Sequence, residues 1–207
     1  MQKLLNISGR KIYLVSDSSA LVSVYYILDK EVGGILINTP EYSDEVAVQL
    51  KQAGGVSFIF YPSFFGAKDV DLWRNALNAE TMASEVEQSA IQGTVDISID
   101  SKTKLTRTID FLTMAGRTRG SCALRLKNLP GAIFFGPILS PNDSGWPGLN
   151  SNDNDYSFES RIFGALALKD LKYDYAFTDK FTVGVTKYGP EVSRHINAEI
   201  ESALDLD

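Results

Sequence analysis

The chain has 207 residues, a net charge of −6 and a sequence pI of about 4.9. With 44% apolar and 11% aromatic residues it can bury a hydrophobic core, which excludes a chain that is disordered by composition. The acidic balance opposes binding to phosphate backbones and anionic bilayers, so we expect no nucleic-acid partner and no membrane partner.

Cysteine usage and the first residues indicate a cytoplasmic protein. Cys122 is the only cysteine, so no internal disulfide can form, which fits a reducing compartment. Its apolar neighbours predict a buried, unreactive thiol. The N-terminus lacks the apolar run of a signal peptide, and no stretch approaches the roughly 18 to 20 apolar residues of a membrane span. We expect one domain over residues 1–207.

The first third of the chain alternates strands with a helix. Runs of β-branched and aromatic residues predict strands over 11–15, 22–28 and 35–37. A helix is predicted over 43–53, because Ser43 is a favourable N-cap followed by two acidic residues that suit the helix dipole. Its apolar side is expected to comprise Val46, Val48, Leu50 and Ala53.

The middle of the chain is mostly β. A short apolar run at 56–60 predicts a buried inner strand. A second helix follows at 68–77, with apolar residues available for packing at Val70, Leu72, Trp73, Ala76 and Leu77. Four further strands are predicted over 94–99, 105–112, 121–126 and 132–135.

The last third begins with a long polar segment. Residues 140–157 are rich in Pro, Gly, Asn, Asp and Ser, and such a long loop without regular structure is usually functional or mobile. Helix 158–168 and strand 173–177 follow. The last helix is predicted to begin at Pro190, which suits the first helical position.

Five segments follow one another as in a known superfamily. They are 24–28 (VYYIL), 33–39 (GGILINT), 62–68 (PSFFGAK), 116–121 (GRTRGS) and 132–136 (AIFFG). They resemble the metallo-β-lactamase motifs N-x-Y-x-I, G-x-x-L-I-D-T, T-H-x-H-x-D-H, G-H-T-x-G-S and F-x-G-D. The resemblance covers most of residues 20–180. It implies an α+β fold, an α/β/β/α sandwich with two mixed sheets between helices.

The same resemblance implies the positions at which relatives bind two metals. At these positions this sequence has other residues than the family's metal ligands. In the family, one metal binds the two histidines of H-x-H and the histidine of G-H-T. The second metal binds the following Asp-His and a late histidine, and a carboxylate after F-x-G bridges the two metals. The corresponding residues are Ser63, Phe65, Arg117, Ala67, Lys68, Asp179, Lys180 and Pro137. The single histidine, His195, lies past the motifs and is expected to pack or face solvent. Because such sites need several imidazole or thiolate donors, we expect no metal, no cofactor and no metal-dependent hydrolysis.

Two cations, Lys68 and Arg117, replace residues that converge on one site in relatives. They could hold a phosphate, a carboxylate or another anion. The interpretation that we favour pairs them with carboxylates such as Asp69 or Asp179, which would leave the former site neutral.

Three further observations concern the cleft and the polar segment after it. The aromatic pair at 64–65 favours a cleft that is partly filled. Ser63 has no identifiable general base, so we assign no catalytic residue. Asn150 to Asp155 could bind calcium, but the spacing favours a solvated loop.

We predict a non-catalytic protein of this fold that binds a protein or a small ligand. The alternative is a metal-independent enzyme, or a sensor, that uses the cleft for an anionic small molecule. An open, positively charged cleft would favour the alternative, and a filled one would favour a binding module. The partner is not specified by the sequence, and a homodimer is compatible with it.

Overall fold

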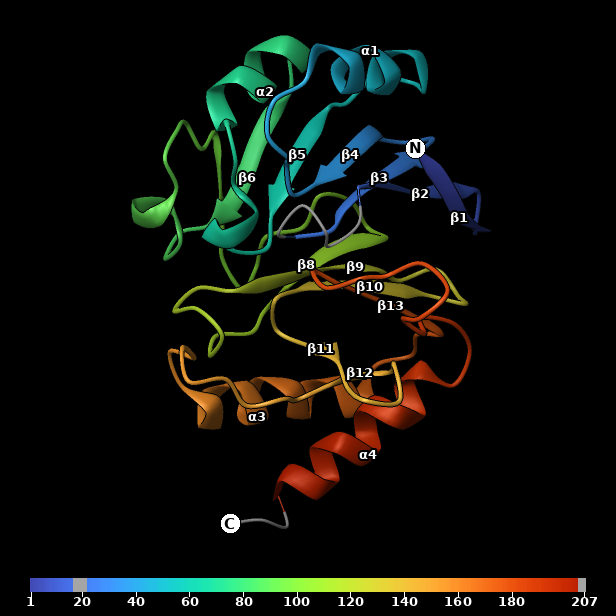
Figure 1. Ribbon diagram of the computed structural model, residues 1–207, viewed down its shortest axis with the longest axis vertical. Helices are drawn as coiled ribbons and strands as arrows, with labels where there is room; N and C mark the ends of the chain where they lie inside the picture. The colour runs from blue at the N-terminus through green and yellow to red at the C-terminus, as the bar shows by residue number, and fades with distance from the viewer. Residues whose placement is uncertain (17–21, 205–207) are drawn as a thin grey trace.

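Two β-sheets lie face to face between two pairs of helices in the computed structural model, which describes residues 1–16 and 22–204 (Figure 1). The order of layers is α/β/β/α, which confirms the predicted fold class. In Figure 1, helices α1 and α2 cover the first sheet, while α3 and α4 cover the second sheet from the opposite side.

The first sheet follows chain order. Its strands pair antiparallel from β1 to β4 and parallel from β4 to β7. They are β1 Gln2–Ile7, β2 Arg10–Ser16, β3 Val24–Asp29, β4 Gly33–Ile37, β5 Phe58–Tyr61, β6 Glu80–Ser84 and β7 Ile97–Ile99.

The second sheet has the order β13-β10-β9-β8, with β10 and β13 parallel and the other pairs antiparallel. Its strands are β8 Ile109–Thr113, β9 Cys122–Leu126, β10 Ala132–Gly136 and β13 Tyr175–Thr178. A separate two-stranded hairpin pairs β11 Ser140–Pro141 with β12 Pro147–Gly148.

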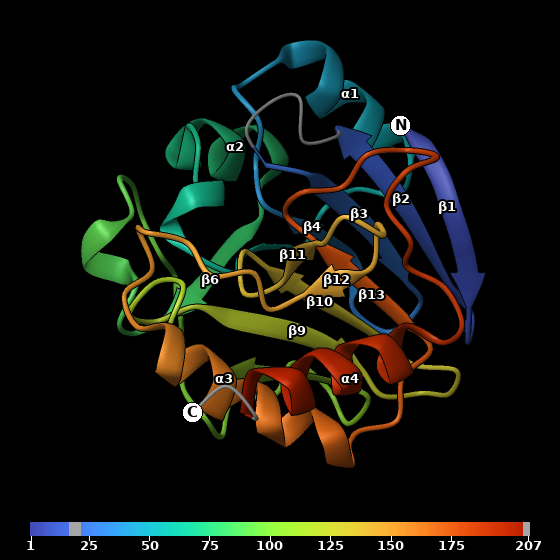
Figure 2. The ribbon, with the colours of Figure 1, turned by 60° about the horizontal axis from the view of Figure 1, so that its bottom comes forward.

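The helices are short and amphipathic. They are α1 Asp44–Gln52, α2 Val70–Leu77, α3 Phe158–Leu166 and α4 Val192–Leu204, with 3-10 turns at Phe64–Gly66, Gln88–Ala90 and Ala167–Asp170. Figure 2 shows α3 and α4 together over the second sheet. No helix in the described part of the chain is long and apolar enough to cross a membrane.

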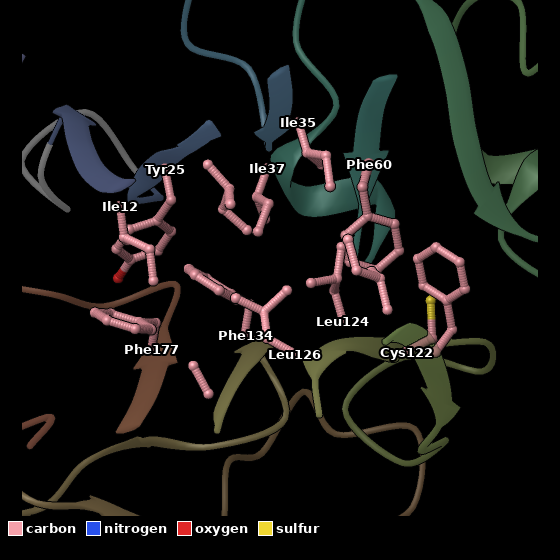
Figure 3. Close-up of a cluster of buried hydrophobic side chains, with 14 of the residues drawn as sticks. Ile12, Tyr25, Ile35, Ile37, Phe60, Cys122, Leu124, Leu126, Phe134 and Phe177 are labelled. Atoms are coloured by element: carbon pink, nitrogen blue, oxygen red, sulfur yellow. The ribbon is translucent and has the colours of Figure 1, made fainter. Parts of the chain in front are cut away.

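Side-chain alternation explains why two sheets can share one core. Along β3, Tyr25 and Ile27 face the second sheet, whereas Val24 and Tyr26 face the helices. Figure 3 shows the layer between the sheets, where Phe134 from β10 and Phe177 from β13 meet side chains of the first sheet. Fully burying each such side chain contributes about 1.5–3 kcal/mol, so the inter-sheet layer contributes substantially to stability.

Several local expectations hold, and others are wrong. Ser43 caps α1 and its hydroxyl accepts from Val46 N–H. Val48 and Leu72 are exposed, because α1 and α2 each bury only a narrow stripe. Strands β1 and β6 were not predicted. β1 is a polar edge strand whose burial is slight, and β6 follows α2 as a buried parallel strand with little β-branched character.

The predicted start of the last helix is also wrong. Glu191 has a left-handed backbone (φ 80°), so the helix begins at Val192 instead of Pro190. The segment 140–157 is not wholly irregular, since it contains the β11–β12 hairpin.

Candidate functional site

A cavity of about 570 Å³ opens where several strands end. Its walls come from the residues that follow β5, β10 and β13, from the turn before β9, and from the β11–β12 segment. Neighbouring parallel strands bring their carboxyl ends to the same edge, which is where open α/β sheets commonly place ligand sites. The packing of the two sheets therefore brings segments more than a hundred residues apart to one cavity.

The structure brings five of the six sequence-predicted site residues to this cavity. Phe65, Lys68, Arg117, Pro137 and Asp179 all line it. Ser63, the sixth, is buried and does not line the cavity. Its hydroxyl accepts from the N–H of Phe65 at 3.3 Å and begins the short 3-10 helix, so its observed role is local and structural.

Arg117 forms an ion pair with a residue that was not expected. Its Nη1 lies 3.1 Å from Oδ1 of Asp155 and 2.9 Å from the carbonyl oxygen of Asn154. Its guanidinium carbon lies 5.1 Å from the centre of the Phe65 ring. Arg161, which is fully buried on α3, binds the other oxygen of Asp155. Asp155 thus joins two arginines and holds the end of the 140–157 segment against the cavity.

The expectation that Asp69 or Asp179 neutralises the two cations is therefore wrong. Asp69 accepts from the N–H of Tyr42 at 2.7 Å instead. Neither Lys68 nor Lys180 forms an ion pair with any residue in the ranges 1–16 and 22–204. Both lysines are exposed and line the cavity. The site therefore retains two ammonium groups without a carboxylate partner among the described residues.

Asp179 is a buried carboxyl with few hydrogen-bond donors. It is 4% exposed, and its Oδ1 accepts from Nδ2 of Asn38 at 2.8 Å. Its Oδ2 has no hydrogen-bond partner among the described residues. Burial, opposed only by the Asn38 hydrogen bond, raises the pKa of Asp179 to about 7. Asn38 stands where the family motif G-x-x-L-I-D-T has aspartate, but its contact with Asp179 follows from the fold alone.

Glu87 is a site residue that sequence reasoning missed. This carboxylate, 2% exposed, lies beyond β6 and accepts from the N–H of Phe64 at 2.9 Å and of Gly120 at 2.8 Å. The loop after β5 and the turn before β9 are further joined by a bond from Cys122 N–H to Pro62 O at 2.9 Å. These are the two loops that carry metal ligands in the family, and here a carboxylate joins them. No motif surrounds Glu87, so the sequence contained no signal for this role.

The aromatic pair at 64–65 forms a wall of the cavity and leaves the rest of it open. Phe64 and Phe65 lie with ring centres 4.4 Å apart, and Phe64 is 37% exposed. Pro137 and Pro141 add further apolar surface, while Asn150 supplies an amide. The cleft is open, partly apolar and bordered by cations.

The donors at this cavity do not fit the metal centre that the fold implies. No group of three or more His, Cys, Asp or Glu side chains that could hold a metal occurs in the part of the chain that the structure describes. His195 stacks on Trp146, with ring centres 4.2 Å apart, away from the cavity lining. Cys122 is buried as predicted, and burial raises the pKa of its thiol to about 12. Among the residues that the structure describes, Asp179 is thus the only one of these donors that lines the cavity.

Solved structures with the same fold are known, although the sequence is distant from them. A B3 metallo-β-lactamase with an active-site glutamic acid is 16% identical, with a TM-score of 0.66 over 99% of this chain and 88% of that chain. The Cronobacter sakazakii metallo-β-lactamase with the HARLDQ motif is 12% identical, with a TM-score of 0.69 over 100% and 93%. SMB-1 bound to 2-mercaptoethanesulfonate is 13% identical, with a TM-score of 0.70 over 100% and 95%.

These similarities establish the metallo-β-lactamase fold for this chain. No protein-family model matches the sequence, and no curated protein matches it. At these identities the shared architecture carries no information on activity, so function has to be argued from the cavity.

Proposed function

We propose that the protein binds a small organic anion in this cavity without a metal ion. The observation that carries the proposal is an open cavity of about 570 Å³ bordered by two lysines, Lys68 and Lys180, that no carboxylate neutralises among the described residues. Cations that share a concave, partly apolar site raise the local concentration of anions and attract them over short distances.

The apolar part of the lining supports an organic anion in preference to an inorganic one. Phe64, Pro137 and Pro141 can cover a carbon skeleton, and each buried methylene contributes about 0.8 kcal/mol. The volume falls within the range of about 300–1,000 Å³ for small-molecule sites. The net charge of −6 and the single cysteine support a cytoplasmic protein without nucleic-acid or membrane partners.

A metal-independent enzyme is the second candidate, because Asp179 is a carboxyl whose pKa is raised to about 7 at the cavity wall. General acid–base catalysts need such values. No serine of the lining donates a hydrogen bond to a carboxylate or an imidazole within the described ranges, which is why binding is proposed first.

Benzenesulfonate is a suitable probe, because its negative charge is constant from acidic to alkaline pH and its ring matches the apolar walls. Titration is followed by calorimetry and by NMR shifts, with neutral benzenesulfonamide and inorganic sulfate as comparisons. We expect saturable binding of benzenesulfonate, weaker binding of sulfate and none of the neutral compound.

Replacing both Lys68 and Lys180 by Gln should weaken binding of benzenesulfonate at least about tenfold. The matched control is Lys51→Gln on α1, an exposed lysine outside the cavity lining, which should leave binding unchanged. Absence of saturable binding at about 10 mM probe, or equal binding of the neutral compound, would refute the proposal.

A further inference from the structure

We propose that the anion is taken up together with one proton, which is held by the carboxyl of Asp179. This inference rests on the proposed function and adds the chemistry of its regulation: the ligand binds the form of the cavity in which Asp179 is neutral. The fold offers this buried carboxyl few groups that could stabilise its charge.

A buried carboxylate is normally surrounded by several donors or by a cation. Asp179 has one side-chain donor, the amide of Asn38 at 2.8 Å, and that amide is shared with the carbonyl oxygen of Ser23 at 2.9 Å. Oδ2 is buried without any partner in the described structure. The neutral acid is therefore the form that this environment accommodates best.

Within the described ranges, the elements packed around Asp179 bring no compensating charge. From β3, the hydroxyl of Tyr25 donates to the carbonyl oxygen of Thr178 at 2.6 Å, and not to the carboxyl. Burial first, and then the charge of Asp179, raise the pKa of Tyr25, so the tyrosine stays neutral. From the loop after β5 and the end of β10, Pro62 and Gly136 contribute no charge.

The cations of the cavity do not pair with Asp179 either. Arg117 and Arg161 are both bound to Asp155. Lys68 and Lys180 line the same cavity and form no ion pair within the described ranges. An anion attracted by the lysines would enter a cavity whose wall contains this carboxyl.

The direction of the coupling follows from electrostatics. A bound anion repels an ionised Asp179 and so favours its acid form, which raises the pKa above its free value of about 7. By linkage, binding then takes up a proton at neutral pH. Affinity is greatest below the free pKa and decreases as the pH rises through the pKa of the complex.

Benzenesulfonate again serves as the probe, because the charge of the ligand does not change. Calorimetry at neutral pH in two buffers with different enthalpies of ionisation counts the protons taken up by the unmodified protein. We expect a fraction of one proton per ligand, and a dissociation constant about three- to tenfold larger near pH 8 than near pH 6.

Asp179→Asn is the decisive variant, because the amide has the shape of the neutral acid and can still accept from Asn38. It should bind benzenesulfonate without proton uptake and with an affinity that is constant between about pH 6 and pH 8. Near pH 8 it should bind more tightly than the unmodified protein.

Binding without proton uptake in the unmodified protein would overturn this inference and leave the proposed function standing. Equal pH dependence in Asp179→Asn would also overturn it, because another group would then take up the proton. Absence of any saturable binding would instead refute the proposed function itself.

Discussion

The buried carboxyl of Asp179 should lower the stability of the fold at neutral and alkaline pH, and replacing it by Asn should reveal the cost. In the folded protein, burial raises the pKa from 3.8 to about 7. Each unit corresponds to about 1.36 kcal/mol, so ionised Asp179 costs the folded state roughly 4 kcal/mol. The contribution of Asp179 to the free energy of unfolding is therefore most favourable below the pKa that this carboxyl has in the unfolded chain. The contribution decreases between about pH 4 and pH 7.

The Asn variant cannot ionise, but it leaves an amide donor without a partner, which costs about 1–3 kcal/mol at all pH values. We therefore expect Asp179→Asn to be slightly less stable than the unmodified protein near pH 4 and more stable near pH 8. The difference between the two proteins should change by roughly 4 kcal/mol over this range. The crossing of the two stability curves is the diagnostic result.

The assay is urea unfolding followed by circular dichroism at several pH values. Comparing variants removes the contribution of Asp29 and Asp110, whose pKa values are lowered and which stabilise the fold in the opposite direction. Asp143→Asn, an exposed residue, is the control and should show a constant difference. A difference between Asp179→Asn and the unmodified protein that does not depend on pH would refute the reasoning.

Three other changes test the architecture of the site. Glu87→Ala leaves two buried N–H groups without acceptors and should cost about 3 kcal/mol in urea unfolding, whereas Glu85→Ala, exposed on the same loop, should cost little. Arg161→Met leaves the carbonyl oxygen of Ile138 and one oxygen of Asp155 without their hydrogen-bond donor. This change should lower the free energy of unfolding by about 3 kcal/mol. EDTA should leave the unfolding midpoint unchanged, and elemental analysis should find no stoichiometric zinc, iron or manganese. A lower midpoint in EDTA would contradict the metal-free interpretation.

Much of the fold could be predicted because local patterns and tertiary structure agree. The run of β-branched and aromatic residues over 22–28 and the capping signal at Ser43 each depend on near neighbours in the chain, and both predictions were correct. The strands β1 and β6 could not be predicted, since their pairing partners, and not their own residues, make them strands.

For the candidate site, the positions of most of the residues could be predicted, but their charge partners could not. The resemblance placed Phe65, Lys68, Arg117, Pro137 and Asp179 in one cleft, and the structure brings them to one cavity. The charge partners could not be read from the sequence. Each nearby carboxylate is a plausible partner until the loops are placed.

The sequence by itself determined which chemistry is available: one histidine, one cysteine, and cations where relatives have metal ligands. Only the tertiary structure decided how those groups are paired. Asp155 binds Arg117 because the 140–157 segment packs beside α3, and Glu87 joins two loops because β6 ends beneath them. Side-chain pairing depends on distances of a few ångströms between residues far apart in the chain, and those distances exist only once the two sheets have packed.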